Sequence, residues 1–373
     1  MNWTSKTPSV VATLWIAALP GQAAHSLWEQ HMKEAAGLEK ASRFQEARSA
    51  YQLALPDEDG RSPDSRLRQA MTWNNLALLN RCLGNYAEAR QQYRKALDLF
   101  ENTVGPRSSQ YASALHNLAA LDYAQGNLDE AIRQFRCALS VREEILGESD
   151  PATAQTLNSL AAVYTVQGRY AEAERLCRRA LAIEESTLGP EHPQVSATLA
   201  NLASICRRRS QFETALDLSL RADQIARKAF GDRHLVTCLR ANHVAVMYFD
   251  LQRFTEALEL LRRTLEIQLQ TLGEDNPDVA ATMANLAAVY SHQKRPAEAE
   301  ALYHRALTIL EHASANNQKL AELMSNYAWL LRQIGRKSEA KKLQARASAI
   351  SVAGQHDRNR LTVDVSTLLS PRR

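Results

Sequence analysis

The sequence predicts an all-α protein, an α-solenoid of about eight helical hairpins, from three features that recur every 42 residues. The first feature is a pair of alanine columns, each occupying one position in seven successive repeats. The second is a glycine in the middle of four of the repeats, and the third is a glycine near the end of five of them. Self-similarity at such a period is typical of a helical repeat array, in which each hairpin packs only on its neighbours.

The alanine columns mark the places where two helices are expected to cross. One column is Ala35, Ala77, Ala119, Ala161, Ala203, Ala245 and Ala287, and the other is Ala47, Ala89, Ala131, Ala173, Ala215, Ala257 and Ala299. An eighth repeat, one residue shorter, continues them at Ala328 and Ala340. Small side chains allow helix axes to approach to about 8–10 Å. Larger residues, such as Leu76 and Leu118 in one column, are expected to fill the remaining core.

Each repeat is predicted to hold two amphipathic helices, for example Arg66–Leu83 and Tyr86–Asn102, joined by a tight turn at Gly84. The same turn position is occupied by Gly126, Gly168 and Gly335, where glycine allows a positive φ. The glycines near the repeat ends are Gly105, Gly147, Gly189, Gly231 and Gly273. Each follows a bulky apolar residue, which predicts a helix ended by a left-handed C′ residue. Asp150-Pro151 and Asn276-Pro277 predict the next helix starts, with a capping side chain before a first-turn proline.

These features place the solenoid at residues 25–350. The predicted repeats are 25–62, 63–105, 106–147, 148–189, 190–231, 232–273, 274–314 and 315–350. The first repeat carries Glu34 where later repeats have leucine, so its outer face is polar, as expected at the end of an array. Residues 351–373 are predicted to be a basic, mostly disordered tail, with folding back onto the array as the alternative.

The N-terminal residues 1–24 have the layout of a secretory signal peptide. Lys6 precedes the apolar stretch Val10–Leu19, and Pro20-Gly21 leads to small residues with cleavage expected after Ala23 or Ala24. The stretch is shorter than the roughly 20 residues that a membrane span requires. We therefore expect a periplasmic or secreted protein without a membrane span. The alternative is a cytoplasmic protein in which this segment forms an extra hydrophobic helix that caps the array.

The repeat resembles a known family at the level of whole motifs. Leu-Asn-Ser-Leu-Ala-Ala-Val-Tyr (157–164) leads to Gly168-Arg-Tyr-Ala-Glu-Ala-Glu174, and Leu188-Gly-Pro-Glu-His-Pro193 ends the repeat. This pattern resembles the 42-residue tetratricopeptide (TPR) repeat of kinesin light chains, and the resemblance covers about residues 27–350. It implies a right-handed solenoid that binds proteins or peptides. Kinesin light chains also carry a heptad segment that joins the motor, which this sequence lacks, so a motor-adaptor role is not carried over. Similar arrays are widespread in bacteria, a setting that fits the N-terminal segment.

Composition argues against several other functions. The net charge is only +4, with 45 basic residues spread among 41 acidic ones, so nucleic-acid binding is not predicted. The five cysteines form no CxxC pair, which predicts neither a disulfide framework nor a zinc site, and we expect them to be small packing residues. Standard nucleophile, zinc-protease and phosphate-loop motifs are missing from the sequence, so no catalytic residue and no cofactor is predicted. Asp57-Glu-Asp-Gly60 is interpreted as a solvated turn, because it lacks the rest of a calcium loop.

A polar column on the first helices is the candidate binding site. It contains Asn75, Asn117, Ser159, Asn201, His243, Asn285 and Asn326. Asparagine is a mediocre helix former, so its recurrence calls for an explanation. By the resemblance, this column points into the concave groove, where an amide can match both the C=O and the N–H of an extended peptide. The alternative is that these amides bond to one another and only rigidify the array.

Basic residues farther along the same helices add to this picture. Arg81 and Arg208 are included in the predicted groove, and Lys40, Arg207 and Arg332 share its face. They predict a mildly basic groove that prefers a ligand with Asp or Glu, although solvated helix ends would explain the same cations. Trp329 is expected either to stack at one end of the groove or to belong to the core. The leading hypothesis is a non-catalytic peptide-binding scaffold. The alternatives are a cytoplasmic peptide-sensing receptor and an enzyme with a site between repeats.

Overall fold

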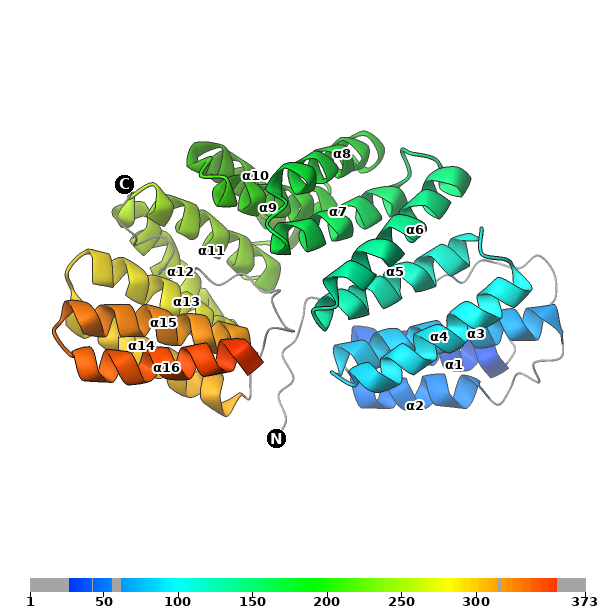
Figure 1. Cartoon of the computed structure of the whole chain (residues 1–373), viewed down its shortest axis with the longest axis horizontal. Helices are drawn as coiled ribbons and strands as arrows, with labels where there is room; N and C mark the ends of the chain where they lie inside the picture. The colour runs from blue at the N-terminus through cyan, green and yellow to red at the C-terminus, as the bar shows by residue number, and fades with distance from the viewer. Residues whose placement is uncertain (1–26, 42, 56–61, 314–316, 354–373) are drawn as a thin grey trace. The chain divides into compact units, whose positions relative to one another are not determined.

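The computed structural model describes residues 27–41, 43–55, 62–313 and 317–353, and these form sixteen α-helices and no strand (Figure 1). Helices alternate along the chain as the first and second members of antiparallel hairpins. The first helices are α1 Leu27–Lys40, α3 Pro63–Cys82, α5 Ser109–Ala124, α7 Pro151–Val166, α9 Pro193–Arg208, α11 Leu235–Asp250, α13 Pro277–His292 and α15 Asn317–Gln333. The second helices are α2 Phe44–Ala54, α4 Tyr86–Thr103, α6 Leu128–Leu146, α8 Tyr170–Leu188, α10 Phe212–Phe230, α12 Phe254–Leu272, α14 Pro296–His312 and α16 Lys337–Ala353. The predicted all-α hairpin array is confirmed.

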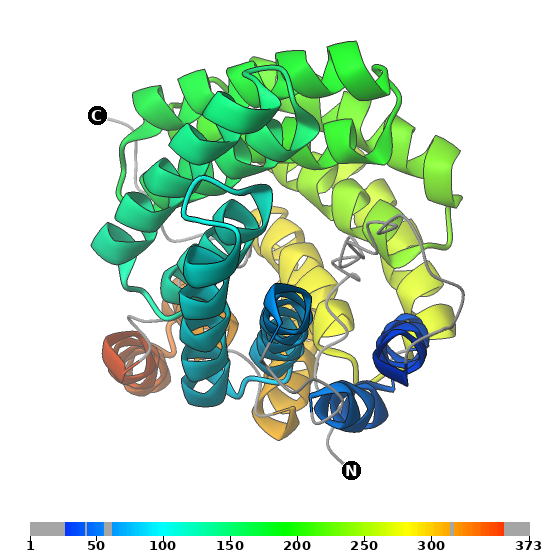
Figure 2. The same ribbon diagram turned by 90° about the vertical axis from the view of Figure 1, so that its right-hand side faces the viewer.

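The contacts divide the chain into two units, which we describe separately. In the described part, the N-terminal unit comprises residues 27–123 and 127–160, and the C-terminal unit comprises residues 124–126 and 161–353. Figure 2 shows the green and yellow hairpins of the C-terminal unit following one another in chain order. None of the described helices combines the length and the apolarity that crossing a membrane requires.

Both alanine columns lie in the core, as predicted. Every member of the column from Ala47 to Ala299 is 0% exposed, and no member of the column from Ala35 to Ala287 is more than 2% exposed. Leu76 and Leu202 of the leucine column are also buried, at 1% and 0% exposure. The array therefore owes its regular spacing to small side chains at the helix crossings and large ones between them.

The mid-repeat turns share one conformation, even where glycine is absent. Gly84, Gly126, Gly168 and Gly335 have φ between 77° and 86°, and Ser210, Gln252 and Lys294 occupy the same position with φ of 57–60°. In each turn the residue after this position donates its N–H to the carbonyl five residues earlier, as Arg169 does to Tyr164 at 2.9 Å. This is the Schellman arrangement, which satisfies the free carbonyls at the end of a first helix.

The glycines near the repeat ends differ from the prediction. Gly147, Gly189, Gly231 and Gly273 have φ of 80–92°, but their ψ values are 153–170°. That combination is extended rather than left-handed helical, and it is open almost only to glycine. The prediction of a left-handed helical conformation at these positions is therefore wrong. The observed conformation excludes other residues more strictly than the predicted one, so glycine is required even more.

Capping side chains start several first helices. Asp150 and Asn276 accept the N–H of Ala152 and Asp278 at 2.7 and 2.8 Å, as predicted. The Nδ1 atoms of His192 and His234 take the same role at 3.2 Å, which the sequence reasoning missed. The predicted start of α3 at Arg66 is three residues late, because Ser62 caps the helix and Pro63 is its first residue.

Several predictions fall partly or wholly outside the described residues. The proposed signal peptide, the Asp57–Gly60 turn and residues 354–373 all lie outside them. Residues 351–353, assigned to the disordered tail, instead continue α16. Of the five cysteines, Cys177, Cys206 and Cys238 are buried as expected, whereas Cys82 and Cys137 are exposed and do not serve as core packing residues.

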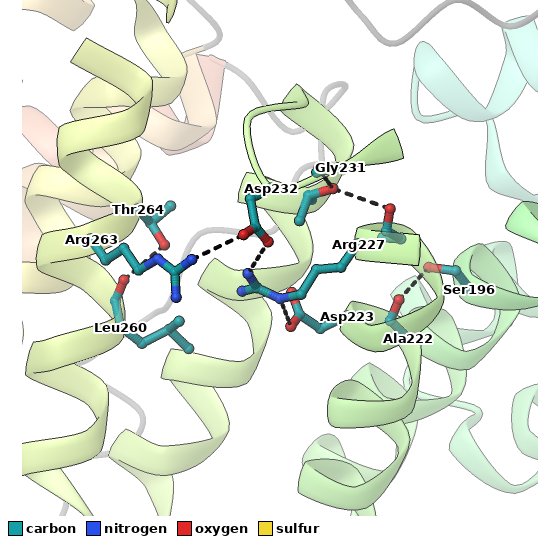
Figure 3. Close-up of polar contacts among 11 residues, drawn as sticks. Ser196, Ala222, Asp223, Arg227, Gly231, Asp232, Leu260, Arg263 and Thr264 are labelled. Carbon is teal, nitrogen blue, oxygen red and sulfur yellow. Dashed lines mark hydrogen bonds and ion pairs between the residues drawn. The ribbon is translucent and has the colours of Figure 1, made fainter. Parts of the chain in front are cut away.

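Ion pairs connect successive second helices through the loop that precedes the next first helix. In the C-terminal unit, Asp232 accepts from Arg227 at 2.6 Å and from Arg263 at 3.0 Å (Figure 3). Arg227 also donates to Asp223 at 2.6 Å, so one arginine connects two acidic residues and links α10 to the loop before α11. Exposed pairs of this kind contribute little individually, about 0–1 kcal/mol each.

Candidate functional site

The candidate surface lies on the first helices, which contact one another directly. In the C-terminal unit α9 contacts α11, α11 contacts α13, and α13 contacts α15. We call the side that carries Asn201, His243, Asn285 and Asn326 the first-helix surface. Hydrogen bonds between successive first helices run along this side, as described next, so the predicted column does lie where neighbouring repeats meet.

In the N-terminal unit the column is engaged in lateral hydrogen bonds. Asn117 donates to the amide oxygen of Asn74 at 3.1 Å, and Asn74 donates to Asn75 at 3.3 Å. Asn75 also hydrogen-bonds the hydroxyl of Tyr51. These amides connect α3 to α5 and to the first hairpin, which is the structural role that the sequence left open as the alternative.

In the C-terminal unit this series of lateral hydrogen bonds between amides, which we call the amide ladder, is interrupted. Asn285 approaches the amide oxygen of Asn242 at 3.5 Å, and Asn242 donates to Thr282 at 2.8 Å. One repeat earlier, Ala200 stands where Asn74 and Asn242 stand in their repeats. The ladder therefore has no acceptor at that step.

The members of the column next to this interruption differ in exposure. Asn201 is exposed and makes no side-chain hydrogen bond within the described part of the chain. His243 is 8% exposed, and its Nε2 has no partner among the described atoms. Burial, together with the charges of Arg240 and Arg207, lowers the pKa of His243 to about 3, so the ring is neutral. Asn326 is buried at 3% exposure, below the reach of a ligand.

The predicted basic residues do not act as one group. Arg208 is exposed and has no partner in the described residues. Arg207 is ion-paired with Asp250, whose side chain is 0% exposed, and Arg332 donates to Gln344 at 2.9 Å. Arg81 is half-buried beside the hydroxyl of Tyr93, where its charge opposes the rise in the pKa of Tyr93 that burial causes. Lys40 has no described side chain.

Trp329 of α15 belongs to an aromatic cluster with His292 of α13 and Phe254 of α12. Its ring stacks on His292 with centroids 5.6 Å apart and planes 8° apart, and His292 stacks in turn on Phe254 at 5.3 Å. Trp329 also packs against the core of the C-terminal unit while remaining half-exposed. It therefore serves the core and contributes one face to the surface.

A polar layer that the sequence reasoning missed joins second helices to the first helices of the next repeats. We use this name for the second-helix residues Arg142, Glu184 and Gln268 together with the first-helix residues Thr156, Thr198, Arg240 and Thr282. These positions repeat every 42 residues, and in most cases the second-helix residue bonds the threonine of the next repeat. Gln268 accepts from Thr282 at 2.6 Å, and Glu184 bonds Thr198. Alignment of the repeats could have revealed this layer, because it places Arg142, Glu184 and Gln268 at a position that is apolar in other repeats.

The two arginines of the polar layer are satisfied to different extents. Arg142 is 4% exposed and donates to the Ala152 carbonyl, to Thr156 and to Ser113, at 2.7, 2.7 and 3.3 Å. Arg240 donates only from Nε, to the Ser196 hydroxyl at 3.1 Å. Burial lowers the pKa of both guanidinium groups to about 10. Neither arginine forms an ion pair with a described residue.

On the first-helix surface, Asn201 and Arg208 are thus exposed without a hydrogen-bond partner among the described residues, and Asn285 is partly exposed. Within the described residues, no group of three His, Cys, Asp or Glu side chains is placed to hold a metal ion. What the surface offers is hydrogen bonding and charge at fixed positions on rigid helices.

Comparison with known proteins places this architecture in the class of helical repeat proteins. The family model described as tetratricopeptide repeat matches residues 68–144, 152–228, 237–312 and 281–351. The chain belongs to the tetratricopeptide repeat family. No protein among those with curated functions matches it.

Solved structures with the same fold include bacterial regulators. The apo quorum sensor NprR from B. thuringiensis is 14% identical, with a TM-score of 0.66 over 87% of each chain. A Rap protein in complex with competence and sporulation factor is 14% identical, with a TM-score of 0.58 over 89% of this chain and 99% of that one. Putative kinesin light chain repeats from Podosopora anserina are 24% identical over 56% of this chain and 97% of theirs, with a TM-score of 0.49. Identities in this range establish the shared fold and nothing about ligands.

Proposed function

We propose that this protein is a non-catalytic scaffold that binds a protein or an extended peptide along its first-helix surface. The observation that supports this most is Asn201. Its amide is exposed, has no partner within the described residues, and occupies a helix position where alanine would be the better residue. An exposed amide there offers one donor and one acceptor to a peptide backbone.

The spacing of the first helices supports an extended ligand. Packed helices lie about 8–10 Å apart, and an extended chain rises about 3.3 Å per residue. A bound peptide would therefore pass one first helix at about every third residue. Asn201 and the partly exposed Asn285 lie two repeats apart on this path. The solved complex of a Rap protein shows that this fold can hold a partner.

The two roles of asparagine provide a direct test. Asn201→Ala should weaken ligand binding by about 1–3 kcal/mol, since it leaves peptide groups unpaired. It should leave the free energy of unfolding unchanged, or raise it by a few tenths of a kcal/mol, through helix propensity. Asn117→Ala is the matched control. It removes the lateral bond to Asn74 and should cost about 0.5–1.5 kcal/mol of stability.

The ligand for this test comes from affinity capture out of the native host, followed by titration calorimetry and urea denaturation of both variants. Unchanged affinity in Asn201→Ala, together with a loss of stability, would show that the amide is structural. The proposed binding surface would then be abandoned.

We further propose that the protein acts outside the cytoplasm, in the periplasm or after secretion. The support is the sequence of residues 1–24, with its apolar stretch and small residues before Ala24. N-terminal sequencing of the protein purified from its host tests this. A mature N-terminus near Ala24 or His25 supports export, whereas an intact N-terminus favours a cytoplasmic peptide sensor with the same binding surface.

A further inference from the structure

The positive charge of Arg240, on α11, has no ion-pair partner among the described residues. Its Nε donates to Ser196, and neither terminal amino group has a hydrogen-bond partner within the described residues. A guanidinium carries five N–H donors, so most of its capacity is unused. Burial lowers its pKa to about 10, an effect that Asp223 partly opposes. The side chain is partly exposed, so the group is a partly desolvated cation without a contacting anion.

The acidic residues around Arg240 are engaged elsewhere. Asp223 faces Arg240 but pairs with Arg227 at 2.6 Å, and Arg227 also holds Asp232 (Figure 3). Asp250, the carboxylate of α11, lies ten residues along the helix, about 15 Å away, and is paired with Arg207. Both carboxylates have arginine partners, although Oδ1 of Asp223 accepts no hydrogen bond within the described residues, and Arg240 forms an ion pair with neither.

The repeat register explains how this situation arises. At the other polar-layer positions a threonine stands in place of Arg240, bonded to a polar residue of the preceding second helix. Ala226 occupies that partner position for Arg240 and offers no side-chain acceptor. The substitution of Thr by Arg at position 240 therefore introduced a charge without an acceptor on the preceding helix.

Two further unmet groups share the surface with Arg240. His243 lies one turn along α11, 8% exposed, with its Nε2 unpartnered because Ala200 interrupts the amide ladder. The neutral imidazole can carry its proton on Nε2 and donate it. Asn201, on the adjacent helix α9, offers its exposed amide. The two terminal amino groups of Arg240 and the Nε2 atom of His243, which is close enough for the charge of Arg240 to lower its pKa, thus lie on α11 without hydrogen-bond partners among the described residues. The exposed amide of Asn201 lies on α9, which contacts this helix.

We propose that Arg240 is the receptor for an acidic side chain of the bound peptide, with Asn201 holding the peptide main chain beside it. A planar guanidinium matches a carboxylate through two parallel hydrogen bonds, and such a pair is strongest where water is partly excluded. This proposal rests on the proposed function and gives it a ligand chemistry, an Asp or Glu at a fixed position. Arg208, exposed about two turns along α9 from Asn201, adds positive charge to the approach.

The test uses a display library of random 12-residue peptides joined to the coat protein through their C-termini, so that only side chains supply carboxylates. The full-length protein is expected to select peptides with Asp or Glu at one fixed position. Arg240→Gln should lose that acidic preference, and should bind a synthetic selected peptide about 10- to 100-fold more weakly, as expected for a charge-assisted hydrogen bond. Arg240→Lys, which keeps the charge but not the planar fork, should recover part of the affinity.

The matched control is Arg175→Gln. Arg175 is an exposed arginine of α8 that makes no hydrogen bond within the described residues and whose charge acts on Glu172, so the variant loses the same charge on a second helix. It should keep full affinity. Thermal melts of all three variants exclude unfolding as the cause, because removal of an uncompensated buried charge should not lower the melting temperature.

The outcomes separate the two proposals. A selection that returns no peptide overturns the proposed function. Selected peptides without a fixed acid, or an acidic preference that survives Arg240→Gln, overturn the carboxylate subsite alone. Amidating the C-terminus of the synthetic peptide should leave its affinity unchanged. If amidation abolishes the dependence on Arg240, the site binds a chain terminus and the side-chain assignment is wrong.

Discussion

Replacing Gly189 by alanine should destabilise the C-terminal unit far more than replacing Gly168. The two glycines flank the same helix, α8, and a Cβ added at either would meet nothing within 4 Å, so only the backbone conformation distinguishes them. Gly168 has φ of 77° in a Schellman turn, a region that costs a non-glycine residue about 1–2 kcal/mol. Gly189 combines φ of 90° with ψ of 153°, a region open almost only to glycine, at a cost of up to about 3 kcal/mol.

Both substitutions also lower the conformational entropy of the unfolded chain, which stabilises the folded protein by about 0.4–1 kcal/mol in each case. The net losses expected are therefore about 0.5–1 kcal/mol for Gly168→Ala and about 2 kcal/mol for Gly189→Ala. Urea denaturation measures the loss, and hydrogen exchange of the α8 amides locates it. Arg175→Ala, in the exposed middle of α8, is the control without backbone strain. Equal losses for the two glycines would refute the distinction between the two turn types.

Two further predictions concern the interior of the C-terminal unit. Glu184 is 2% exposed, and burial raises its pKa from 4.5 to about 7, so the folded protein binds the extra proton and loses stability as pH rises between these values. Glu184→Gln should therefore be more stable than the wild type at pH 8 by about 1–3 kcal/mol, with little difference at pH 5, as urea denaturation at both pH values will show. Ala203, 2% exposed at a helix crossing, has no room for leucine. Ala203→Leu should cost about 1–3 kcal/mol by thermal melts, and a neutral result would contradict the assigned crossing.

The repeat architecture could be predicted from the sequence because backbone geometry and small-residue packing depend on residue type alone. An alanine that recurs every 42 residues reports a helix crossing wherever it occurs, and all these alanines are buried. The turn at Gln252 shows where this reasoning stops. The repeat imposes the Schellman turn there although the residue does not favour it, so only alignment with Gly168 would have revealed it.

The candidate site could be predicted only in part. The asparagine column was located correctly on the first helices, but exposure depends on neighbours that a single column does not show. Asn117 is tied to Asn74, whereas Nε2 of His243 has no described partner because position 200 is alanine. The state of Arg240 was hidden for the same reason, since it follows from Ala226 on another helix. Whether a polar residue is free depends on which residue stands opposite it in another column, and a single column does not show this.

The polar layer also makes the order of the repeats matter. Removing the single repeat 190–231 would bring α8 against α11 in register, and Glu184 would then face Arg240 at the position that Thr198 now occupies. The two charges would neutralise each other, and the shortened array would gain an internal ion pair while losing its free guanidinium. A relative without this repeat would keep Arg240 and His243, lose Asn201, and have a different ligand preference. In such an array, recognition is encoded in the sequence of neighbours along the chain, and gain or loss of a repeat is a change of specificity as well as of length.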